Sequence, residues 1–110
     1  MAYANALTAL ADPTRRRVFE RLRAGPASVS DLAANLPVSR PAVSQHLKAL
    51  KLAGLVRDRP DGARRVYCID PQGLGELRRW LDQFWTDALQ AFKHEAEKPT
   101  VTPAARKKTP

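Results

Sequence analysis

The sequence predicts a mainly α-helical domain with a small β-hairpin, in the order helix, helix, helix, helix, strand, strand, helix. Apolar residues recur at helical spacing in each proposed helix, and capping residues, glycines and prolines separate these segments. Strand-forming residues lie on both sides of one strong turn signal, Asp61-Gly62. The 110 residues suit a single domain.

The N-terminal part of the chain predicts two short helices. Residues 3–10 form the first. Asp12-Pro13 begins the second, because Asp is a preferred N-cap and Pro fits the first helical turn. Val18 and Leu22 lie on one apolar face of this helix, which ends before Gly25.

Residues 28–51 predict two further helices joined by a tight turn. Ser28 and Asp31 resemble a capping box at the start of the first helix, and Pro37 stops it. Ser39 begins the second helix. This arrangement is a helix-turn-helix, which holds its second helix outward so that it can enter a DNA groove.

The outer face of this recognition helix carries side chains of the types that read DNA. Arg pairs with guanine, Gln pairs with adenine, and Ser reaches bases or phosphates. No Asp or Glu lies between Ser39 and Arg57, so the face has only positive charge. The predicted DNA contacts of this helix are Ser39, Arg40, Pro41, Ser44, Gln45, His46 and Lys48.

The hairpin adds a second basic element. Residues 55–59 and 66–69 are the β-prone segments, and arginines near the turn suit the minor groove or the adjacent phosphates. The predicted DNA contacts of this wing are Arg57, Arg59, Arg64 and Arg65. The fold class is therefore a winged helix-turn-helix.

The last helix is predicted to begin after Asp70-Pro71 and to run to about Glu97. Leucine, tryptophan and phenylalanine side chains are spread around it, which is more apolar surface than one small domain can cover. A second copy of the chain is the natural partner for this helix, so we expect a homodimer.

Charge and composition narrow the partners and the location. The net charge of +8 and the pI of about 10.4 indicate a polyanionic partner, here double-stranded DNA. The chain has no membrane-length apolar run, no secretory signal pattern and only one cysteine, Cys68, so we expect a cytoplasmic protein without a membrane partner. Residues 1–97 form the predicted domain, and residues 98–110 a disordered, basic, Pro/Lys-rich tail.

Several stretches resemble the ArsR family of bacterial winged helix-turn-helix repressors. They are Ala9-Leu10-Ala11-Asp12-Pro13-Thr14-Arg15-Arg16-Arg17, residues 38–50, residues 52–56 and Arg65-Val66-Tyr67. The resemblance covers roughly residues 5–95. It implies a homodimer that binds an imperfect palindrome and blocks transcription, with the interface on the first and last helices. The expected interface residues are Leu7, Leu10, Leu77, Trp80, Leu81, Phe84, Trp85 and Ala88.

The sequence departs from the metal-sensing members of that family. Where one family site has Cys-Val-Cys-Asp-Leu, residues 28–32 read Ser-Val-Ser-Asp-Leu, and serine is a poor ligand for soft metals. A second family site pairs Asp-x-His with His-x-x-Glu in the last helix, which here has only His94 as a histidine. We expect no metal site and no cofactor.

Other functions remain as alternatives. The sequence has no carboxylate cluster, metal set or catalytic triad, so an enzyme is not expected. The main alternative is an architectural protein that binds DNA largely without sequence preference, using the basic tail. Release from DNA could follow binding of a small-molecule or lipid-like effector against the last helix, or need no effector.

Overall fold

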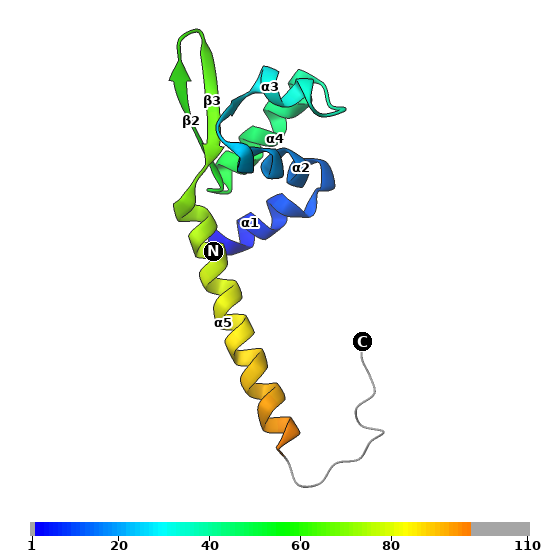
Figure 1. Ribbon diagram of the computed structural model, residues 1–110, viewed down its shortest axis with the longest axis vertical. Coiled ribbons are helices and arrows are strands. Elements are labelled where there is room, and N and C mark those ends of the chain that lie inside the picture. Colours follow the sequence, from blue (N-terminus) through cyan, green and yellow to red (C-terminus); the bar gives the residue numbers. More distant parts are fainter. Residues whose placement is uncertain (1, 98–110) are drawn as a thin grey trace. The chain divides into compact units, whose positions relative to one another are not determined.

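A computed structural model describes residues 2–97 of the protein (Figure 1). The chain divides into two compact units, Met1–Trp80 and Leu81–Pro110. The predicted disordered tail, residues 98–110, lies outside the described residues.

The first unit contains the helix-turn-helix and the hairpin, and the order of elements confirms the predicted fold class. The elements are α1 (Ala2–Ala11), α2 (Pro13–Arg21), the 3-10 turn η1 (Leu22–Ala24), β1 (Ala27–Ser28), α3 (Val29–Ala34), α4 (Arg40–Leu52), β2 (Val56–Asp61), β3 (Arg64–Ile69) and α5 (Pro71–Ala96). The last of these, α5, begins in the first unit and forms the described part of the second.

Side-chain caps begin three of the helices where the sequence predicts them. The Asp12 carboxylate accepts hydrogen bonds from the backbone N–H groups of Thr14 and Arg15, at 2.9 and 3.0 Å. These bonds, led by the one from Arg15, lower the pKa of Asp12. Ser28 and Asp31 form the predicted capping box, and the Ser39 hydroxyl accepts from the N–H of Ala42. Each cap satisfies backbone donors that the first helical turn leaves without partners.

The sheet has three antiparallel strands in the order β1-β3-β2, one more than the sequence predicts. In β1, Ser28 pairs with Val66, while Asp61 at the end of β2 pairs with Arg64. A two-residue strand has no alternation to detect, so β1 is recognised only from its pairing with β3. A second difference is that α3 already ends at Ala34, before the predicted stop at Pro37.

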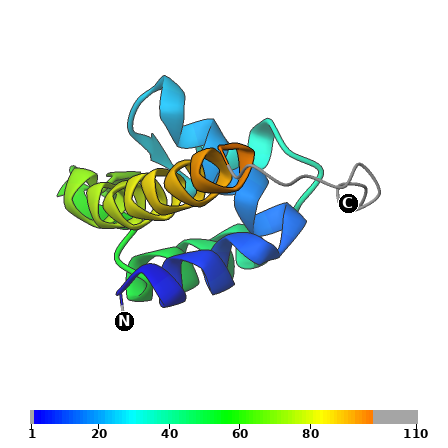
Figure 2. The ribbon, with the colours of Figure 1, turned by 90° about the horizontal axis from the view of Figure 1, so that it is seen from below.

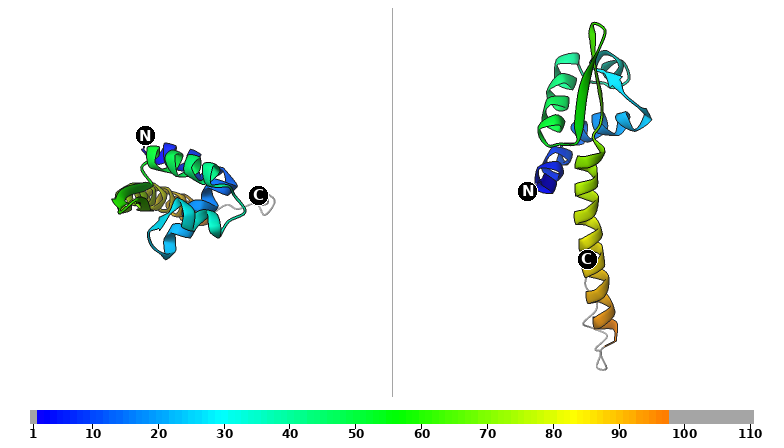
Figure 3. Two further views of the ribbon diagram at one scale, coloured as in Figure 1. Left: turned by 90° about the horizontal axis from the view of Figure 1, so that it is seen from above. Right: turned by 90° about the vertical axis from the view of Figure 1, so that its left-hand side faces the viewer.

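The core of the first unit lies between the helices and the base of the hairpin. Figures 2 and 3 show α1 alongside α4, with α2 and α3 packed close by. The buried apolar residues that form this core cluster are Ala6, Ala9, Val18, Leu22, Leu32, Val43, Leu47, Leu50, Leu55 and Val56. Every one of the four helices α1 to α4 contributes to this cluster, so none of them depends on its own length for stability.

The start of α5 is fixed by a close approach of two glycines. The backbone of Gly73 lies so near the carbonyl group of Gly54 that a Cβ atom on Gly73 would overlap its oxygen. Gly54 itself has a φ of +80°, a conformation that favours glycine. The backbone N–H of Asp70 also donates to the carbonyl of Leu55, at 2.9 Å. These contacts place the first turn of α5 against the turn between α4 and β2.

We predict that Gly73→Ala destabilises the protein by about 3 kcal/mol, because the added methyl group forces the two backbones apart. Gly75→Ala is the matched control, since a Cβ there would meet only the Arg79 guanidinium at 3.9 Å. The control should gain about 0.5–1 kcal/mol, as alanine is the better helix former. Urea denaturation followed by circular dichroism measures both variants, and equal stabilities for the two would contradict the close approach.

Candidate nucleic-acid interface

The packing of α4 decides which of its side chains face outward. Val43, Leu47 and Leu50 are completely buried against the rest of the domain. Six of the predicted contact residues remain exposed, namely Ser39, Arg40, Pro41, Ser44, Gln45 and Lys48. The structure thus brings six of the seven residues predicted on the recognition helix to one accessible, carboxylate-free surface.

The seventh predicted residue, His46, is in a different environment. It is half-buried, and its Nδ1 atom accepts a hydrogen bond from Nε of Arg15 on α2, at 3.3 Å. A neutral imidazole that accepts at Nδ1 has its proton on Nε2. We therefore assign His46 to the contact between α2 and α4.

On β2, alternation of side chains separates the arginines from an aspartate. Arg57 and Arg59 point to the same side of the strand and are exposed, and neither forms an ion pair with another described residue. Asp58 lies between them, so its side chain points to the opposite side of the strand. These two arginines are the wing residues best placed to contact DNA.

The Asp58 carboxylate joins three elements of the domain. Its side chain is only 8% exposed and binds Nζ of Lys51 on α4 at 2.8 Å and Nη1 of Arg65 on β3 at 3.0 Å. The hydrogen bond from Lys51 is the main cause that lowers the pKa of Asp58 below its usual 3.8, against the opposing effect of burial. Lys51 therefore holds the hairpin against α4, while Arg65 joins the two strands of the hairpin at the same carboxylate.

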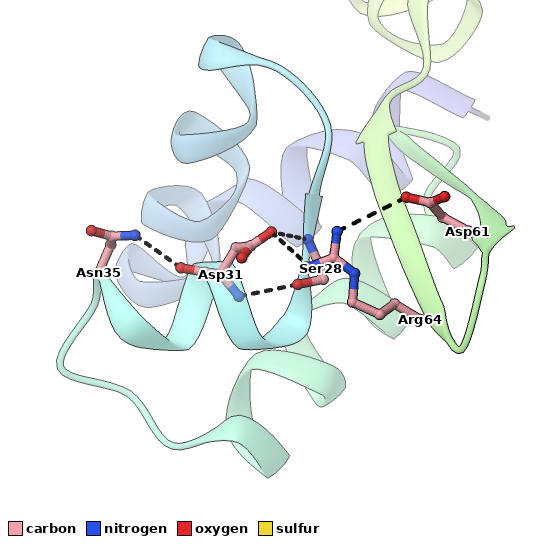
Figure 4. Close-up of polar contacts among 5 residues, drawn as sticks. All are labelled: Ser28, Asp31, Asn35, Asp61 and Arg64. Atoms are coloured by element: carbon pink, nitrogen blue, oxygen red, sulfur yellow. Dashed lines mark hydrogen bonds and ion pairs between the residues drawn. The ribbon is translucent and has the colours of Figure 1, made fainter.

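Arg64 also has acidic neighbours, as Figure 4 shows. Its guanidinium lies 3.7 Å from the Asp31 carboxylate on α3 and 3.9 Å from that of Asp61. Asp31 is held by the capping box, and the backbone N–H of Ser28 is the main cause that lowers its pKa. The sequence predicts four equivalent wing arginines, whereas the structure divides them into two unpaired and two paired with carboxylates.

The residues expected at a dimer interface also divide into two groups. Leu10 and Leu77 pack partly against the core of their own chain, and the Trp80 ring stacks on Tyr3 with centroids 5.2 Å apart. The other expected residues are exposed, namely Leu7, Leu81, Phe84, Trp85 and Ala88. Part of the expected interface is thus already used inside one chain.

Comparison with known proteins places this geometry in a family. A helix-turn-helix domain family matches residues 10–59. The chain is 64% identical over 84 residues to the HTH-type transcriptional regulator Rv2034 of Mycobacterium tuberculosis, which covers 76% of this chain and 78% of that protein. It is 31% identical over 80 residues to the transcriptional repressor SdpR of Bacillus subtilis, covering 73% of this chain and 89% of that one.

A solved structure supports the same relationship. The ArsR-like transcriptional regulator from Rhodococcus sp. RHA1 matches with a TM-score of 0.74 and 35% identity, over 88% of this chain and 94% of that chain. The chain belongs to the ArsR family of helix-turn-helix transcriptional regulators. It is a DNA-binding regulator and not an enzyme.

Family membership identifies the two elements of the fold that a winged helix-turn-helix protein uses toward DNA. In the winged helix-turn-helix fold, α4 is the second helix of the helix-turn-helix, and the hairpin of β2 and β3 is the wing. None of the helices described is long and apolar enough to span a membrane.

We predict that Asp58→Asn lowers the free energy of unfolding by about 1–2 kcal/mol near pH 7, because two ion pairs lose their carboxylate while Lys51 and Arg65 remain half-exposed to water. Because the pKa of Asp58 is lowered in the folded state, its carboxylate stabilises the fold at pH values above the ordinary pKa of 3.8. This stabilisation is lost as the pH falls below that value. The difference between wild type and variant should therefore shrink at about pH 3. Chemical denaturation at both pH values measures it.

Asp61→Asn is the control for this experiment. The Asp61 side chain is 56% exposed and lies 3.9 Å from Arg64, so its loss should change the stability by less than about 0.5 kcal/mol. If Asp58→Asn proved as mild as the control at neutral pH, the carboxylate would not be what holds the hairpin to α4.

Proposed function

We propose that this ArsR-family regulator is a homodimeric cytoplasmic repressor that binds a two-fold-symmetric operator. The observation that carries the proposal is the exposed, carboxylate-free face of α4. Arg40 and Gln45 have the donor and acceptor geometry to read guanine and adenine, respectively. Ser44 reaches bases or phosphates, and Lys48 suits phosphates.

The first turn of α4 and the wing supply contacts to the DNA backbone under this proposal. The Ser39 hydroxyl accepts the N–H of Ala42, and further N–H groups of this helix start can donate to a phosphate. Pro41 fits the first turn of α4, because the N–H group that proline lacks would have no partner within the helix there. On the wing, Arg57 and Arg59 lie on one side of β2 and contact the minor groove or its phosphates. Arg64 and Arg65 contribute mainly by positioning the hairpin.

The apolar face of α5 supports the homodimer. Leu81, Phe84 and Trp85 are 53%, 59% and 62% exposed. Leu89 and Phe92 continue the same face at helical spacing and are also exposed. A row of large apolar side chains is unfavourable in water, and a second copy presenting the same face covers it symmetrically. Two copies then present two recognition helices to the two halves of an operator.

The residues at the α3 site of metal-sensing relatives support a repressor without a metal inducer. The Ser28 hydroxyl accepts the N–H of Asp31, and the Asp31 carboxylate accepts the N–H of Ser28. The Ser28 hydroxyl and the Asp31 carboxylate are thus already hydrogen-bonded in the helix cap. A hydroxyl group is also a poor ligand for soft metal ions. The described residues hold no cluster of three or more His, Cys, Asp or Glu suited to a metal ion.

We expect zinc, nickel, cadmium and arsenite each to leave operator affinity unchanged within about twofold, because the α3 residues do not fit these ions. Electrophoretic mobility shift with and without each ion measures the operator affinity, and EDTA-treated protein is the reference. A loss of affinity of about tenfold with one ion would show a metal inducer.

Affinity selection of genomic DNA fragments tests the operator. At near-physiological salt with excess random competitor, we expect a few fragments that share a two-fold-symmetric site with half-sites about one helical turn apart. Recovery of fragments in proportion to their abundance would instead favour an architectural, non-specific DNA-binding protein.

We predict that Gln45→Ala and Arg40→Ala each reduce discrimination between the selected site and random DNA by about 1–3 kcal/mol, because base contacts are lost. Arg59→Ala is the comparison variant: it should weaken both DNAs alike and reduce the salt dependence. If Gln45→Ala lowered the affinity for the selected site and for random DNA equally, Gln45 would not contact a base.

We predict that Phe84→Glu dissociates the dimer, because a buried carboxylate would face its own copy across the symmetric interface. Gln90→Glu is the control with the same added charge, since Gln90 lies about half a turn around α5 from Leu81 and Trp85. Sedimentation velocity measures the mass of both variants. A Phe84→Glu protein that sediments as the wild-type dimer would exclude this face as the interface.

A further inference from the structure

The outward side of α2 and η1 carries arginines that DNA recognition does not use. They line a shallow hollow with a volume of about 520 Å³. Its lining residues are Arg17, Glu20, Arg21, Arg23 and Ala24. All of them are exposed, and none of the three arginines forms an ion pair or side-chain hydrogen bond with another described residue.

Other arginines of the same helix have structural roles that explain their presence. Arg15 donates to His46 on α4 at 3.3 Å, and Nη1 of Arg16 donates to the carbonyl of Leu10 on α1 at 2.7 Å. Arg17 and Arg21 have no such partner, and Glu20, which lies one turn after Arg17, forms no ion pair with a described residue. Three unpaired guanidinium groups around one hollow form a surface suited to an acidic partner.

This surface faces away from the recognition helix. Arg15 marks the side of α2 that packs against α4, and the two helices lie in contact (Figure 1). At 100° per residue, Arg17 and Arg21 lie about 160° and 120° around α2 from Arg15. The exposed face of α4 is on the other side of that helix from its buried contacts with the domain. A straight duplex on α4 therefore leaves the hollow of α2 accessible.

Glu20 indicates what kind of acidic molecule fits. The charged groups of a nucleic acid are all phosphates, and Glu20 in the lining of the hollow would repel them. A protein segment can place carboxylates on the arginines and a basic side chain on Glu20. We propose that the α2–η1 surface docks an acidic protein segment with one basic residue while α4 is bound to DNA. The proposal requires DNA binding by α4 but neither a dimer nor a symmetric operator.

Two charge-reversed variants with the same change in net charge test the proposal. Arg17→Glu/Arg21→Glu alters the hollow, and Arg40→Glu/Lys48→Glu alters the recognition face. The probe is a fluorescein-labelled peptide of aspartates and glutamates with one central lysine, measured by fluorescence anisotropy. Wild-type and hollow-variant proteins are first saturated with unlabelled duplex, so that the recognition face is occupied, and duplex affinity is measured separately for each protein.

The hollow variant should bind the peptide at least about tenfold more weakly and the duplex within about threefold of wild type. The recognition-face variant, assayed without duplex, should keep its peptide affinity and lose at least about tenfold in duplex affinity. Unchanged peptide binding by the hollow variant would overturn the proposal. A loss of duplex affinity equal to that of the recognition-face variant would assign the surface to nucleic acid instead and would also overturn it.

Two further variants guard against misleading results. If the hollow variant fails to show a wild-type thermal melt, Arg17→Gln/Arg21→Gln replaces it under the same criteria. Glu20→Lys should strengthen duplex binding modestly but weaken binding of the lysine-containing peptide by about threefold or more, because the peptide's lysine then faces a like charge. Stronger peptide binding by Glu20→Lys would contradict the proposed mixed-charge partner.

Discussion

The burial of one side of α4 is the constraint on which the rest of the structure depends. Val43, Leu47 and Leu50 are removed completely from water, and this fixes the rotation of the helix about its own axis. Because the rotation is fixed, Gln45 and its neighbours face outward together. The surface that we propose for DNA binding is therefore the other side of a hydrophobic contact, and a change in the core would alter which residues face outward.

A buried carboxylate extends this constraint to the wing. Asp58 contacts Lys51 at the end of α4 and Arg65 on β3, so the hairpin and the recognition helix share one ion-pair network. Arginines that look alike in the sequence have different roles as a result. Arg65 pairs with Asp58 inside the hairpin, Arg59 is unpaired, and Arg17 lines the hollow on α2 and η1. The position of a carboxylate within reach, and not the arginine itself, makes the difference.

Local signals were sufficient to predict the helix starts and the hairpin. The caps at Asp12, Ser28 and Ser39 involve residues no more than three positions apart, so their hydrogen bonds can be inferred from the sequence alone. Pairings between distant residues could not be inferred in this way. The strand β1 and the contact of Arg15 with His46 both depend on which segments the core brings together.

The sequence by itself determined the winged helix-turn-helix order, the helix starts and the buried face of α4, because helical periodicity and capping act over a few residues. Only the tertiary structure decided which basic side chains are available for DNA. Arg64 and Arg65 meet carboxylates of α3 and β2, while Arg57 and Arg59 do not. The reason is physical: an ion pair requires two groups within about 4 Å, and the folded chain sets that distance, not the spacing along the sequence.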